Sequence, residues 1–126
     1  MQNIYSQEFL HYYKNQPNKK EINPFDLEGR EVNLSCGDDL TVRLKLDQHE
    51  NIIEVGYTGD GCAVCEGAMS MLAEELEGKH IDYIKSLSEE DFFNFLGLEL
   101  TPSRQKCALI GYMGIMNSMK NYENKQ

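Results

Sequence analysis

Hydrophobic and polar residues alternate in three segments of the first half of the chain, at residues 30–34, 40–46 and 53–57. Alternation with a period of two is typical of a strand with one buried face, so each segment is predicted to be a strand. Residues 47–51 (DQHEN) separate the second and third segments and have a turn-forming composition. The sequence therefore predicts that these two strands form an antiparallel hairpin.

Apolar residues follow a helical spacing before and after these segments. Residues 4–13 predict a short first helix, which Asn15 and Pro17 bring to an end. A longer helix is predicted after residues 59–61 (GDG), with a stop at Gly78. The predicted strands are therefore preceded and followed by helices.

The last third of the chain predicts three more helices. Residues 80–87 indicate a short one, and Ser88 with Asp91 forms a capping box that opens a helix over 89–96. Pro102 is expected in the first turn of the last helix. The aromatic residues expected in the core are Phe92, Phe93 and Phe95. The side chains expected to face the sheet from the last helix are Leu109, Tyr112, Met113, Met116 and Met119.

The order of these elements predicts an α+β fold. We expect a single domain over residues 1–126, in which a three-stranded antiparallel sheet packs against helices. A chain of 126 residues buries a core without needing disulfide bonds, and neither an internal repeat nor a low-complexity tract interrupts the pattern.

Charge and hydropathy then exclude several classes of partner. The chain has 21 acidic and 12 basic residues, and a formal net charge of -9 opposes binding to nucleic acid or to an anionic membrane. The first residues lack the pattern of a signal peptide. The longest near-apolar run, 107–116, has ten residues, whereas a membrane span needs about 20. A cytoplasmic location is expected, where the four cysteines serve as thiols, metal ligands or sulfur carriers rather than as disulfides.

Three of the cysteines are predicted to lie where elements begin or end. Cys36 lies between the first two strands, Cys62 at a strand-to-helix junction, and Cys107 near the start of the last helix. Their separations of 26 and 45 residues differ from the paired ligands of zinc fingers and ribbons, so a shared site has to be assembled by the fold. Asp38 lies close enough to Cys36 to reach the same ion. Three thiolates and one carboxylate suit zinc or iron.

The cysteines belong to three short motifs: 36–38 (CGD), 59–63 (GDGCA) leading into 68–71 (AMSM), and 104–108 (RQKCA). Together with residues 4–15, these motifs resemble iron-sulfur cluster assembly scaffolds of the IscU/SufU/NifU N-terminal type. The resemblance covers nearly the whole chain and implies a SufE/NifU-like sandwich fold. It also implies a protein that accepts persulfide sulfur from a cysteine desulfurase, builds a [2Fe-2S] cluster and transfers it to recipient apo-proteins.

The resemblance also implies roles for individual residues. The ligands implied for a [2Fe-2S] cluster, for Fe(II) or for zinc are Cys36, Asp38, Cys62 and Cys107. Cys107 is the expected persulfide acceptor, because Lys106 and Arg104 precede it near a helix N-terminus and cations favour the thiolate. Cys36 is the rival acceptor, since a cysteine in a loop is easily released from a metal.

Two branches of the family remain open. The scaffold branch has a His before its third cysteine and a Leu-Pro-Pro-Val-Lys loop, where this chain has Lys106 and 100–104 (LTPSR), so recognition by the dedicated Hsp70-type chaperone does not carry over. Residues 104–108 resemble the zinc-containing SufU-type sulfur acceptors, although the 45-residue gap leaves no room for their insertion. The scaffold is the first interpretation and a zinc-bound activator of a desulfurase the alternative. Neither turns over a substrate unaided.

Cys65 is a departure from the family's usual pattern. It follows Cys62 by three residues, so the two side chains share a helix face. Three interpretations stay open: the two cysteines form a redox pair, Cys65 offers a spare cluster ligand, or Cys65 is a small residue of the core.

Overall fold

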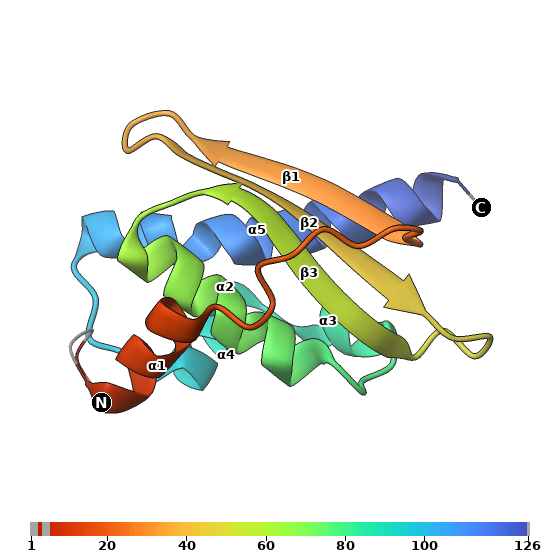
Figure 1. The fold of residues 1–126 in the computed structure, drawn as a ribbon, viewed down its shortest axis with the longest axis horizontal. Helices are drawn as coiled ribbons and strands as arrows, with labels where there is room; N and C mark the ends of the chain where they lie inside the picture. The colour runs from red at the N-terminus through yellow and green to blue at the C-terminus, as the bar shows by residue number, and fades with distance from the viewer. Residues whose placement is uncertain (1–2, 4–5, 126) are drawn as a thin grey trace.

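A three-stranded antiparallel sheet forms one layer of the protein in a computed structural model, which describes residues 3 and 6–125 (Figure 1). Its strands are β1 (Leu27–Asn33), β2 (Asp38–Leu46) and β3 (Ile52–Asp60), in the spatial order β1-β2-β3. The sequence predicted all three strands and their antiparallel arrangement, and the structure confirms both. β1 begins before the predicted strand because Gly29, which has no side chain, occupies a buried position and conceals the alternation.

The predicted hairpin between β2 and β3 is also confirmed. The Asp47 carboxylate accepts the backbone N–H groups of His49 and Asn51 at 2.8 and 2.9 Å, which closes the turn. Glu50 has a left-handed backbone with φ of 65°. The turn sets the register in which Leu44 pairs with Val55.

The described chain also contains five helices. They are α1 (Gln7–Asn15), α2 (Ala63–Leu76), α3 (Asp82–Ser86), α4 (Glu89–Leu96) and α5 (Pro102–Asn124). The first helix starts later than predicted because Ser6 is its cap, accepting the Phe9 N–H; residues 4 and 5 lie outside the described residues. The capping box of Ser88 and Asp91 opens α4 as predicted. Phe92 is buried, whereas Phe93 and Phe95 are half-buried, so the expectation for these two was wrong in part.

Helix α5 lies along β1 and β2 (Figure 1). All five side chains predicted for its apolar face pack in or against the core: Tyr112 and Met119 are buried, and Leu109, Met113 and Met116 are half-buried against it. The sequence did not reveal the small residues that let the helix backbone approach the sheet. A Cβ atom at Gly29 would collide with the Gly114 carbonyl and the Ser118 backbone.

The edge of β1 is covered by polar side chains of α5. Asn117 donates to the Arg30 carbonyl at 2.8 Å, and Asn121 donates to the Glu28 carbonyl at 2.9 Å. These bonds satisfy backbone acceptors that an exposed edge strand would leave open to another chain. Among the described residues no helix is long and apolar enough to cross a membrane.

One end of the sheet collects three segments that are distant in the sequence. The β1–β2 loop, the junction between β3 and α2, and the first turns of α5 all lie at this end, on the left of Figure 1. These are the segments that carry Cys36, Cys62 and Cys107.

Candidate metal centre

Asp38 connects two of the cysteine segments. It is the first residue of β2 and only 1% exposed. One carboxylate oxygen accepts from the Cys36 Sγ at 2.9 Å, and the other accepts the Cys62 backbone N–H at 2.9 Å. A buried carboxylate with two such donors fixes the β1–β2 loop against the start of α2.

The loop that carries Cys36 is a tight turn. The Gly37 N–H donates to the Asn33 carbonyl at 2.9 Å, and Gly37 has φ of 75°, a conformation that glycine adopts without steric cost. The turn leaves Cys36 exposed at the surface. Cys36 is therefore accessible to a partner protein while its thiol is held by Asp38.

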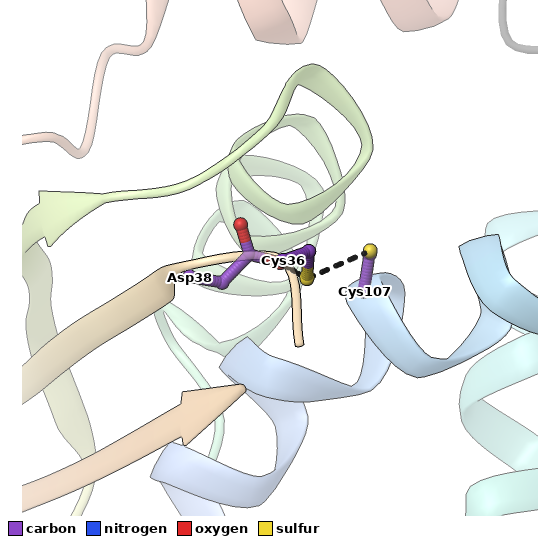
Figure 2. A group of neighbouring side chains, drawn as sticks. All are labelled: Cys36, Asp38 and Cys107. Carbon is purple, nitrogen blue, oxygen red and sulfur yellow. Dashed lines mark hydrogen bonds between the residues drawn. The ribbon is translucent and has the colours of Figure 1, made fainter. Parts of the chain in front are cut away.

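Cys107 reaches the same place from the second turn of α5. Its Sγ lies 3.5 Å from the Sγ of Cys36, and the residue is half-buried (Figure 2). The possible ligand atoms of Cys36, Asp38 and Cys107 all lie within 4.8 Å of one another, and among the described residues these three form the group suited to a metal ion. Three of the four ligands expected from the sequence are thus brought together.

The fourth expected ligand, Cys62, lies beside this group with its thiol engaged elsewhere. Cys62 caps α2, and its Sγ accepts the Cys65 N–H at 3.4 Å. It still interacts with the group, because the Cys62 thiol is among the neighbours that raise the pKa of Cys107. The Cys62 Sγ falls outside the group whose ligand atoms lie within 4.8 Å of one another, so coordination by all four residues requires it to move closer to them. Its hydrogen bond in the helix cap does not prevent this, because a metal-bound thiolate still accepts N–H groups.

The thiols of the group favour their protonated forms. Burial, followed by the hydrogen bond with Cys36, raises the pKa of Cys107. The hydrogen bond to Asp38, followed by burial, raises the pKa of Cys36. A bound cation has the opposite effect and holds cysteines as thiolates. The group is therefore suited to exchange protons for a metal ion.

The two cations expected to activate Cys107 lie at its exposed side. Arg104 and Lys106 are both exposed, and Lys106 lines a shallow hollow together with Cys36 and Cys107. The raised pKa of Cys107 is opposite to the effect that the sequence suggested for these cations. The reason is that burial and the neighbouring Cys36, Cys62 and Asp38 raise the pKa of Cys107, whereas water screens the charges of the two exposed cations.

The burial of Cys65 bears on the interpretations that the sequence left open for this residue. Cys65 is 0% exposed and belongs to the hydrophobic core, which confirms the prediction of a small core residue. Burial raises the pKa of its thiol. Its Sγ nevertheless packs against the junction between β3 and α2 that carries Cys62, since a Cβ atom at Gly61 would be 2.7 Å away from it.

Glu66 is a buried charged residue next to the site, and the sequence pattern did not reveal its burial. It is 6% exposed, accepts the Gly61 N–H at 3.3 Å and pairs with Lys19 at 2.7 Å. The partner that permits its burial, Lys19, comes from a loop 47 residues earlier, so no local pattern could have signalled it.

Comparison with known proteins relates nearly the whole chain to a single protein family. The model of the family described as the NifU-like N terminal domain matches residues 4–126. The chain is 29% identical to "Iron-sulfur cluster assembly scaffold protein IscU" of Aquifex aeolicus, over 97% of this chain and 78% of that protein. It is 24% identical to "Zinc-dependent sulfurtransferase SufU" of Bacillus subtilis, over 95% of this chain and 92% of that protein.

Longer relatives and solved structures extend the comparison. "Nitrogen fixation protein NifU" of Azotobacter chroococcum is 27% identical over 97% of this chain, which spans 40% of that protein's length. A putative scaffold protein for the SUF system from Fervidobacterium islandicum has the same fold, with a TM-score of 0.78 and 23% identity over 92% of this chain and 96% of that one. The N-terminal domain of a NifU-like protein from Brucella abortus gives 0.77 at 17% identity, over 98% of this chain and 96% of that one.

Proposed function

Because this chain belongs to the NifU-like N-terminal domain family of iron-sulfur cluster assembly scaffolds, we propose that it builds a [2Fe-2S] cluster and transfers it to apo-proteins. The proposed ligands are Cys36, Asp38, Cys62 and Cys107. Three thiolates and one carboxylate form a donor set that suits iron and zinc. The carboxylate is the weakest ligand for a soft centre, which favours release of the cluster to a recipient.

One observation carries this proposal. Cys36, Asp38 and Cys107 come from two separate regions of the chain, and their ligand atoms lie within 4.8 Å of one another at the surface. Thiols that serve only packing are normally buried singly. A cluster of thiols around a buried carboxylate is instead the arrangement expected for a metal centre that a partner can reach.

The sulfur of the cluster is proposed to arrive as a persulfide from a cysteine desulfurase. Cys107 is the proposed acceptor, and Cys36 is the rival because it is the more exposed thiol. Their sulfur atoms are 3.5 Å apart, close enough for sulfur to pass between them. Lys106, which lines the hollow with Cys36 and Cys107, would offset the negative charge of the persulfide, and Arg104 would assist from one turn earlier in α5.

Anaerobic reconstitution tests the proposal. The protein is incubated with Fe(II), cysteine and a cysteine desulfurase, and then analysed for iron, acid-labile sulfide and visible absorption. A coloured protein with equal amounts of iron and sulfide is expected. A protein that stays colourless and free of sulfide would contradict the scaffold function.

A zinc-bound sulfur acceptor is the second candidate. It is supported by the similarity to the zinc-dependent sulfurtransferase of Bacillus subtilis, which extends over 92% of that protein. In this case zinc would stay bound during the same reaction. The protein would then accelerate the release of alanine by the desulfurase without acquiring a cluster.

A further inference from the structure

Cys62 and Cys65 form a pair at the N-terminus of α2. Cys62 is the exposed cap of the helix, and Cys65 lies three residues later with 0% exposure. The Cys65 N–H donates to the Cys62 Sγ at 3.4 Å, so the cap holds the exposed sulfur over the buried residue. An exposed first cysteine and a buried second one at a helix N-terminus are the arrangement of C-x-x-C dithiols that undergo thiol–disulfide exchange.

Gly61 allows the buried thiol to pack against the junction between β3 and α2, next to Cys62. A Cβ atom at Gly61 would lie 2.7 Å from the Cys65 Sγ and 3.5 Å from an oxygen of Asp38. The Cys65 thiol is therefore packed against the backbone that carries Cys62, beside the carboxylate of the metal group. Packing alone does not require a sulfur atom at this position, since an alanine or a valine would also fill a core site.

Assembly of a cluster from persulfide sulfur requires a reduction step beside the metal group. Persulfide sulfur is formally neutral, whereas the cluster contains sulfide. Each sulfur atom therefore has to gain two electrons before it joins iron. A pair of thiols supplies two electrons when it becomes a disulfide.

We propose that Cys62 and Cys65 act as an internal dithiol that reduces persulfide sulfur to sulfide beside the metal group. This inference deepens the proposed function and rests on it, because the persulfide arrives from the desulfurase. Cys62 is the thiol that carries the sulfur in the reducing step, receiving it directly or from Cys107. Cys65 is the thiol that resolves it.

The step balances in atoms and electrons. The Cys65 sulfur attacks the Sγ of the Cys62 persulfide, a Cys62–Cys65 disulfide bond forms, and the bond from the Cys62 Sγ to the outer sulfur breaks. The outer sulfur leaves as hydrosulfide with the bonding electron pair, and the proton of Cys65 passes to it or to water. The two cysteine sulfurs are oxidised and the outer sulfur is reduced. A dithiol reductant, in a separate exchange reaction, then restores the pair.

The test uses full-length, metal-free protein in a single turnover without an added thiol. The protein is loaded with glutathione persulfide, separated from the excess reagent, and followed with a sulfide electrode and by intact mass. Wild-type protein is expected to release sulfide and to convert from a mass gain of one sulfur atom to a loss of two hydrogens. Peptide mapping then locates a Cys62–Cys65 disulfide.

Two variants of Cys65 are compared with the wild-type protein. Cys65→Ala and Cys65→Ser should retain the added sulfur, with sulfide release slower by at least about tenfold. Thermal unfolding and zinc binding show whether each variant is folded, and two different replacements guard against a packing defect in one of them. Equal rates of sulfide release in wild type and a folded variant, or a wild-type disulfide that does not join Cys62 to Cys65, would overturn the inference.

A parallel arm separates this inference from the proposed function. Here the sulfur is supplied by a cysteine desulfurase with cysteine in place of glutathione persulfide. Failure of the desulfurase to load wild-type protein contradicts the proposed function, whereas the glutathione persulfide arm still decides whether the dithiol releases sulfide. Loading in both arms followed by Cys65-dependent release supports both.

Discussion

At the scale of single residues, Asp38 has two roles that compete with each other. It holds Cys36 through a thiol and the start of α2 through the Cys62 N–H, each at 2.9 Å. As a ligand it would have to exchange at least one of these bonds for a metal. Asp38 therefore both holds the segments of the site together and serves as the ligand that a metal would lose most easily.

Replacement of Asp38 by Ala separates these roles. The variant leaves the Cys62 N–H without its acceptor, so the metal-free protein is expected to lose about 1–3 kcal/mol of unfolding free energy. A reconstituted cluster is expected to persist longer in air and during transfer, because the labile ligand is absent. Urea unfolding and the decay of visible absorption measure the two effects. A cluster that decays faster than in wild type would count against the labile-ligand role.

The candidate metal ligands could be predicted from the sequence where they belong to a short motif. Cys36, Asp38 and Cys107 could be recognised because glycines and element ends surround them. The capping position of the Cys62 thiol could not, since a side-chain orientation depends on the local helix geometry. Glu66 could not either, because its burial depends on Lys19 from another segment.

At the scale of elements, the contact between α5 and β1 determines how closely Cys107 approaches Cys36. The contact is made by Gly29, Gly114 and Ser118, which allow the helix to lie directly on the strand. The alternation of hydrophobic and polar residues revealed β2 and β3. Small residues on a helix face do not stand out in the hydrophobic pattern, so this contact could not be recognised from the sequence. The existence of α5 and its apolar residues were therefore predictable, whereas the close backbone contact through Gly29, Gly114 and Ser118 was not.

A Cβ atom at Gly29 is expected to push α5 away from β1. Gly29→Ala would collide with the Gly114 carbonyl and the Ser118 backbone, and overpacking of this kind costs about 1–3 kcal/mol. Gly114→Ala is the matched control, because its Cβ would lie 3.4 Å from Val42 and alanine favours the helix. Thermal unfolding should show a lower midpoint for Gly29→Ala alone. Equal midpoints would show that the backbone contact does not limit the packing.

At the scale of the whole molecule, buried thiol and phenol groups link folding to pH. Burial raises the pKa of Cys65 above its ordinary value of 9.0, and it raises the pKa of Tyr57 from 10.0 to about 12. Each group binds its proton more tightly in the folded state than in the unfolded state. Their contribution to stability is therefore complete below the unfolded pKa and is lost as the pH rises toward the folded pKa.

Metal-free protein should accordingly become less stable in alkaline solution. The unfolding midpoint is expected to fall from about pH 8 to about pH 11, and Cys65→Ala should show a shallower fall because one of the linked groups is gone. Thermal unfolding over this pH range in the presence of a chelator measures both. An identical slope for wild type and Cys65→Ala would show that Cys65 does not contribute to the linkage.

Cysteines from three separate segments are proposed to hold one metal ion or cluster. The most direct test is a zinc titration of metal-free protein against a competing chelator, for wild type and for Cys36→Ala, Cys62→Ala, Cys107→Ala and Cys65→Ala. Zinc affinity should fall by at least about a hundredfold in the first three variants and stay within a few-fold of wild type in Cys65→Ala. Unchanged affinity in all of the first three variants would contradict the account.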